Sequence, residues 1–133
     1  MALDVGEKRI GVATANAVAR IAHPLTTLQH TPDIFADLQD LITNQQAAIL
    51  VCGLPRGLDG QHTAQTATVE AFAKQLQQHI TLPLHWQDEA VTSRKAKEEL
   101  AARGAAYPKE AVDALAATYI LEDFLQEHPE VRA

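Results

Sequence analysis

The first fifteen residues alternate apolar and polar positions in the way that is typical of a β-hairpin. Leu3 and Val5 flank Asp4, so a strand here would turn the aspartate to the face opposite its apolar neighbours. A glycine and a charged turn follow at 6–9, and the apolar run 10–13 then leads the chain back. Because a carboxylate within a sheet is costly unless a cation meets it, Asp4 either caps the turn or holds a metal ion.

The pattern after this hairpin alternates between helix and strand. Residues 20–25 predict a third strand, in which Pro24 indicates an edge or a bend. The apolar run at 47–52 predicts a buried, parallel strand, and residues 82–86 predict a further short strand. Four helices are expected, and their predicted first residues are Thr31, Thr63, Thr92 or Ser93, and Pro108. This order predicts an α/β fold, with a mixed five-stranded sheet of three antiparallel and then parallel strands, and helices on both faces.

Composition narrows the classes of protein that fit this pattern. A length of 133 residues suggests a single domain spanning residues 1–133. The one cysteine, Cys52, excludes a disulfide framework, so we expect a cytoplasmic protein. No apolar run approaches the roughly 20 residues that cross a bilayer, so we expect no membrane partner. Only three residues precede Asp4, and we expect the natural chain to start a few residues earlier.

Net charge bears on the kind of partner. A formal charge of −6 argues against a protein that coats nucleic acid non-specifically, although five of the 11 basic residues lie between Arg94 and Lys109. Spacing alone favours a solvated helix face for that group. The oligomeric state stays open.

Besides Asp4, three further acids stand at positions where a catalytic or metal-binding carboxylate is expected. Ligand sites in such sheets collect at the carboxyl ends of parallel strands, where Asp88 and Glu89 follow the run 82–86. Asp113 belongs to the apolar stripe of the last helix, three residues before Ala116. Each acid also has an ordinary explanation, as a solvated loop residue or as a first-turn acid of a helix. Three carboxylates brought together would repel unless a divalent cation, Mg²⁺ or Mn²⁺ rather than zinc, neutralised them.

Four segments in this order and spacing resemble the YqgF/RuvX family of bacterial proteins, which are Holliday-junction-resolvase-like. The segments are ALDVGEKRIGVA at 2–13, VCGLPRGLDG at 51–60, DEAVTS at 88–93 with Ala96, and VDALAATYIL at 112–121. The resemblance implies a ribonuclease H-like fold and a Mg²⁺-dependent nuclease, with Mn²⁺ as the alternative metal. It also implies a role in maturing the 5′ end of pre-16S ribosomal RNA, with resolution of Holliday junctions as the older proposal.

The resemblance also assigns roles to individual residues. The metal-binding and catalytic acids of the family correspond to Asp4, Glu89 and Asp113. The basic residues expected to meet the phosphates of a nucleic acid are Lys8, Arg9, Arg56, Arg94 and Lys109. Ala90 stands where the family usually has an arginine, which favours an alternative: an RNA- or ribosome-binding module that cuts weakly or not at all. A nucleotide-binding relative of the actin-like kinases would need a second domain for which this chain has no room.

Overall fold

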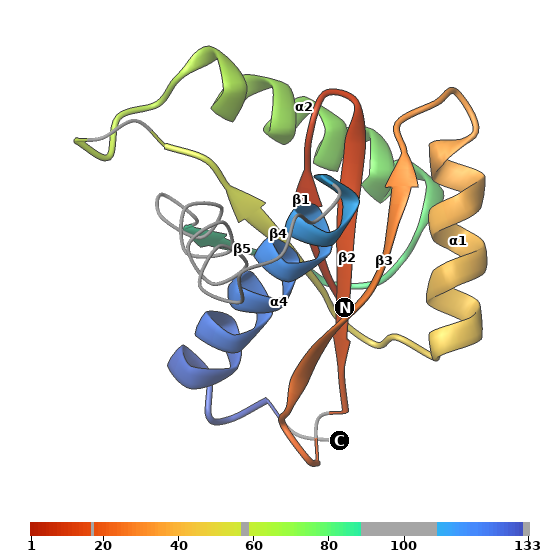
Figure 1. Cartoon of the computed structure of the whole chain (residues 1–133), viewed down its shortest axis with the longest axis vertical. Helices are drawn as coiled ribbons and strands as arrows, with labels where there is room; N and C mark the ends of the chain where they lie inside the picture. Colours follow the sequence, from red (N-terminus) through yellow and green to blue (C-terminus); the bar gives the residue numbers. More distant parts are fainter. Residues whose placement is uncertain (17, 57–58, 89–108, 132–133) are drawn as a thin grey trace.

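The structure, a computed structural model, is built on a five-stranded sheet and describes residues 1–16, 18–56, 59–88 and 109–131 (Figure 1). Its strands are β1 (Ala2–Val5), β2 (Arg9–Ala15), β3 (Ala22–Gln29), β4 (Leu50–Leu54) and β5 (Leu84–Asp88). They lie in the order β3-β2-β1-β4-β5. The pairs β1–β2 and β2–β3 are antiparallel, whereas β1–β4 and β4–β5 are parallel. The predicted mixed sheet is therefore confirmed.

Helices cover both faces of this sheet, as expected. Helices α1 (Ile34–Gln45) and α2 (Ala64–His79) lie on one face, and α4 (Lys109–Glu127) crosses the other (Figure 1). Leu3 and Val5 belong to the core beneath α1 and α2, while Ala2 belongs to the core beneath α4. Because side chains alternate along a strand, Asp4 faces the α4 side together with Ala2. No helix in the described ranges is both long and apolar enough to cross a bilayer.

Three strands begin later than the sequence predicts. The third strand, expected at 20–25, spans Ala22–Gln29, because Arg20 takes a left-handed backbone (φ 57°) in the turn before it. The fourth, expected at 47–52, begins at Leu50: the N–H of Ala47 donates to the Ile42 carbonyl and so ends α1 instead. The fifth, expected at 82–86, begins at Leu84, since Pro83 lacks an N–H for the ladder.

The predicted edge strand and the predicted cap of α2 are confirmed, whereas the predicted cap of α1 is wrong. β3 is an edge strand, as expected from Pro24, and its pairing with β2 shifts register between Val12 and Ala13, the ladder partner of Pro24. Thr63 caps α2 in a reciprocal capping box with Thr66. Thr31, by contrast, does not cap α1: its hydroxyl accepts from the Asp33 N–H, and Asp33 is the cap residue. The helix expected from Thr92 or Ser93 lies outside the described residues. So does Pro108, which was expected to open the last helix.

Arg20 ties the β2–β3 turn to the end of α4. Its guanidinium donates to the carbonyls of Leu125 and Val131, and to that of His128 at 3.2 Å. Leu125 lies in the last turn of α4, and His128 and Val131 follow its end, a place where a cation is favourable.

We therefore expect Arg20→Ala to lower the free energy of unfolding by about 1–3 kcal/mol, because three carbonyls lose a charged donor. Urea denaturation followed by circular dichroism measures the change. Lys74→Ala, at an exposed position of α2, is the matched loss of a cation. Equal midpoints for the two variants would mean that Arg20 does not anchor α4.

Candidate active site

The turn between β1 and β2 fixes the positions of Asp4 and Arg9. The N–H of Gly6 donates to the Arg9 carbonyl at 2.9 Å, and a Cβ at Gly6 would lie 2.6 Å from that same oxygen. This turn therefore requires glycine. In the ladder, Asp4 pairs with Gly11 and Val5 with Ile10. Arg9 and Gly11, two residues apart on one strand, share the face that Asp4 occupies.

His30 supports this turn from the end of β3. Its Nδ1 lies 2.8 Å from the Gly6 carbonyl oxygen, and its N–H donates to the Lys8 carbonyl at 2.9 Å. Its ring contacts Phe72 of α2 edge-on, with the ring centroids 5.2 Å apart. No role was predicted for this histidine from the sequence. Its position between the end of a strand and the start of a helix was the one available signal.

Gly11 brings α4 into direct contact with β2. A Cβ at Gly11 would lie 2.0 Å from the Asp113 carbonyl oxygen and 2.9 Å from the Ala114 N. The backbone of α4 therefore rests on the strand at this point, which only glycine permits. Since Gly11 is also the ladder partner of Asp4, the two aspartates come from backbones that meet at one residue. The structure thus brings together two of the three predicted acids.

An ion pair joins α4 to the first hairpin at the same place. The Nε of Arg9 donates to Oδ2 of Asp113 at 2.6 Å, between residues 104 positions apart in the sequence. Each of the two side chains is 23% exposed. Solvent therefore reaches the pair but covers it only in part, which makes the interaction stronger than that of a fully exposed pair.

A second ion pair lies at the carboxyl ends of β4 and β5. The Nε of Arg56 donates to Oδ1 of Asp88 at 2.9 Å, and both side chains are exposed. The pair spans two neighbouring strands, since Leu54 and Asp88 are ladder partners. The loop after β4 is held in turn by the buried hydroxyl of Thr66, which donates to the Pro55 carbonyl. The carboxyl ends of β1, β4 and β5 therefore carry Asp4, Arg56 and Asp88 at the same end of the sheet.

The other predicted site residues are placed only in part. Lys8 is exposed in the β1–β2 turn, and Lys109 begins α4, one helical turn before Asp113. Glu89 and Arg94 lie outside the described residues, as does Ala90. Glu89 directly follows Asp88, the last residue of β5.

The donor chemistry of this site fits a hard divalent cation. Carboxylate oxygens, which Asp4 and Asp113 supply, are the ligands that Mg²⁺ and Mn²⁺ prefer. Within the described ranges, no three His, Cys, Asp or Glu side chains form a cluster that would hold a metal ion. The described chain therefore contributes two of the three acids expected to hold the ion.

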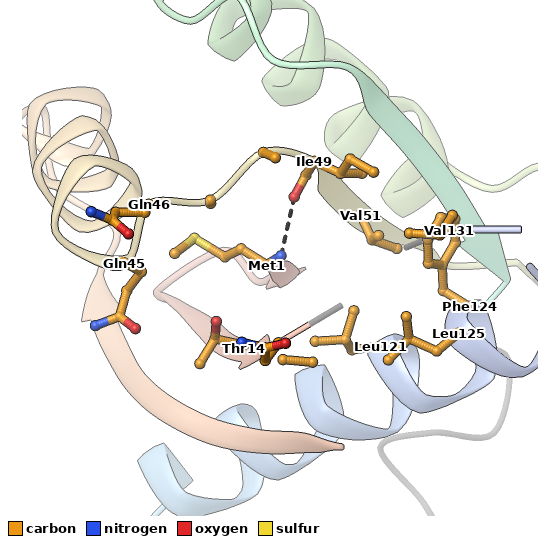
Figure 2. Close-up of a pocket in the computed structure, with 14 residues that line it drawn as sticks. Met1, Thr14, Gln45, Gln46, Ile49, Val51, Leu121, Phe124, Leu125 and Val131 are labelled. Atoms are coloured by element: carbon orange, nitrogen blue, oxygen red, sulfur yellow. Dashed lines mark hydrogen bonds between the residues drawn. The ribbon is translucent and has the colours of Figure 1, made fainter. Parts of the chain in front are cut away.

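A pocket of about 300 Å³ lies at the opposite end of β1 (Figure 2). Its described lining includes Met1, whose amino group donates to the Ile49 carbonyl at 3.1 Å, and Leu121 and Phe124 of α4. Burial lowers the pKa of this amino group to about 6. The described lining residues include no carboxylate.

Comparison with known proteins identifies a family. The family model described as "RuvX: Holliday junction resolvase" matches residues 1–127. A protein of Crocosphaera subtropica named "Putative pre-16S rRNA nuclease" is 39% identical over 131 residues, which cover 96% of this chain and 92% of that protein. A protein of the same name from Chloroflexus aggregans is 39% identical over 129 residues, covering 94% and 91% of the two chains.

Two solved structures show the same fold. Thermus thermophilus RuvC aligns with a TM-score of 0.56, at 16% identity, over 98% of this chain and 96% of RuvC. The same protein in complex with a Holliday junction substrate aligns with a TM-score of 0.57, again at 16% identity. At this identity the likeness shows the fold alone, which is ribonuclease H-like as expected.

Proposed function

The chain belongs to the RuvX family of nucleases, and from this premise we propose that it is a metal-dependent nuclease that processes the 5′ end of pre-16S ribosomal RNA. The observation that carries the proposal is the meeting of two acids at Gly11, where Asp4 of β1 and Asp113 of α4 lie on one face of the sheet. Two ionised carboxylates that share a site favour a bound cation.

In this proposal Asp4, Asp113 and Glu89 hold the metal, with Mg²⁺ as the natural ion and Mn²⁺ as a substitute. When bound, such an ion activates water and stabilises the oxygen that leaves during phosphodiester hydrolysis. Asp4 is held on a paired strand, and Asp113 on a helix that rests directly on the sheet. Both acids therefore sit on rigid elements, which suits a site that must fix the geometry of its ligands.

Basic residues near the carboxyl ends of β1 and β4 are proposed to bind the phosphates of the substrate. Lys8 lies in the turn beside Asp4, and Arg56 lies in the loop after β4. The predicted contacts of Arg9, Arg94 and Lys109 complete the set. The names of the relatives support pre-16S ribosomal RNA as the substrate, whereas the description of the family model supports a branched DNA.

A cleavage assay with two substrates tests this proposal. We expect the protein with Mg²⁺ or Mn²⁺ to cut a labelled RNA that matches the 5′ end of a 16S precursor, and EDTA to stop the reaction. A four-way DNA junction of similar length is the matched competitor. Cutting of the junction alone would replace the RNA with branched DNA as the substrate. Binding of the RNA without cutting under either metal would overturn the nuclease and leave a binding module.

A further inference from the structure

The ion pair between Arg9 and Asp113 engages an acid that the proposed function assigns to the metal. Arg9 donates to Oδ2 of Asp113 at 2.6 Å, so a guanidinium already lies on one of the oxygens in the site. Its strand also carries Gly11, on which the backbone of α4 rests. Arg9 is therefore part of the acidic site in the structure.

A bound cation and this guanidinium have the same electrostatic effect on the site. Each places positive charge beside the carboxylate of Asp113, on the face of the sheet that Asp4 also occupies, and so lowers the repulsion between the two acids. A divalent ion ligated by Oδ2 would lie within roughly 5 Å of the Arg9 Nε, and two cations at that distance repel strongly. Stable occupation of Oδ2 by both is therefore unfavourable.

We propose that Arg9 is a displaceable counter-ion, which competes with the divalent metal ion for Oδ2 of Asp113. This inference rests on the proposed function, because it takes Asp113 as a metal ligand. Arg9 stabilises the acidic site when no ion is bound, and the arriving metal takes its place. With both side chains 23% exposed, the guanidinium has a path toward solvent once it is displaced.

Displacement gives Arg9 a second partner in the same reaction. A guanidinium binds phosphate oxygens in a planar, two-pronged geometry, and a substrate phosphate must approach the metal to be cut. The released arginine thus lies beside the place where phosphate arrives. Metal binding and phosphate binding would then support each other through one side chain.

Titration with Mn²⁺ measured by calorimetry tests this competition without using activity. We expect Arg9→Gln to bind Mn²⁺ roughly three- to tenfold more tightly than the parent, because the ion no longer has to displace a cation. Lys8→Gln is the matched control: it removes the same charge one residue away, from an exposed side chain of the turn. Its affinity is expected to change less than twofold.

A second measurement follows the arginine itself. The Nε–H signal of Arg9 in an NMR spectrum, assigned by its loss in Arg9→Lys, is expected to shift when diamagnetic Mg²⁺, used in place of Mn²⁺, is titrated into the metal-free protein. If Arg9→Gln does not fold, this signal in the parent protein decides the question. Arg9→Lys, which keeps the charge, is expected to bind metal with an affinity between those of the parent and the glutamine variant.

The outcomes separate this inference from the proposed function. A parent that binds neither metal would overturn both. A parent that binds Mn²⁺ and loses binding in Asp113→Asn, with Arg9→Gln unchanged or weaker, would overturn the competition alone. Tighter binding in Arg9→Gln but not in Lys8→Gln, together with a metal-dependent shift of the Arg9 signal, would establish it.

Discussion

Asp4→Asn is expected to lower the rate of metal-dependent cleavage at least about 100-fold. Loss of an outer-shell partner of a metal ligand already costs 10- to 100-fold in affinity or activity, and Asp4 is proposed as a direct ligand. The exchange keeps the size and shape of the side chain but removes its charge. The fold should therefore be preserved, with a thermal midpoint within about 2 °C of the parent. Cleavage of the labelled precursor RNA at saturating Mg²⁺ measures the rate.

The control for this variant is Asp37→Asn on α1. Asp37 is exposed and lies on a helix of the opposite face, and its replacement changes the net charge by the same amount. We expect it to cut at the parental rate. If Asp4→Asn cuts as fast as Asp37→Asn, then Asp4 does not hold the metal and the site lies elsewhere.

Gly11→Ala is expected to cost about 2–3 kcal/mol of unfolding free energy, a fall of roughly 10 °C in the thermal midpoint. The added methyl group would lie 2.0 Å from the Asp113 carbonyl oxygen and 2.3 Å from its carbon, so α4 must move away from β2. That movement separates Asp113 from Asp4 and from Arg9. Cleavage is therefore expected to fall even at a temperature where the variant is fully folded. Thermal melts and cleavage assays at 20–25 °C measure the two effects.

Gly60→Ala is the control for the added methyl group. No atom lies within 4 Å of a Cβ at Gly60, although its positive φ of 79° makes alanine strained there. We expect a cost of about 1 kcal/mol from the backbone alone and no effect on cleavage. A Gly11→Ala protein as stable as Gly60→Ala would show that α4 does not depend on this contact.

The placement of the two aspartates was within reach of sequence reasoning. Asp4 lies between two apolar residues, and the alternation of a strand leaves it only the face opposite Leu3 and Val5. Asp113 shares a helical stripe with Ala116 and Ile120, both of which are fully buried against the sheet. These are local periodicities, and they survive whatever the tertiary contacts are.

The partner of Asp113 was beyond that reasoning. The resemblance to the family predicted that Arg9 meets phosphate. A charged residue in a turn gives no sign of which distant carboxylate it will contact. The pairing depends on where along β2 the helix comes to rest, and Gly11 sets that position through a backbone contact. A glycine inside an apolar run is the one signal that could have indicated a close approach.

The predicted first residues of three strands were wrong for a related reason. Ala47 is apolar and directly precedes a buried strand, yet its N–H completes the end of α1. Hydrogen bonding in three dimensions decides whether a helix or a strand uses a given backbone N–H. The pattern of apolar residues does not report this choice.

The distance between Arg9 and Asp113 along the chain also sets when the site can exist. The hairpin that carries Asp4, Arg9 and Gly11 is complete within the first fifteen residues, whereas its partner acid lies 104 residues beyond Arg9. A contact of such separation closes late, after the loop-closure entropy of the intervening chain has been overcome. During synthesis, a ribosome therefore carries the hairpin long before it carries Asp113. Asp4 and Asp113 therefore come together only once α4 has left the ribosome.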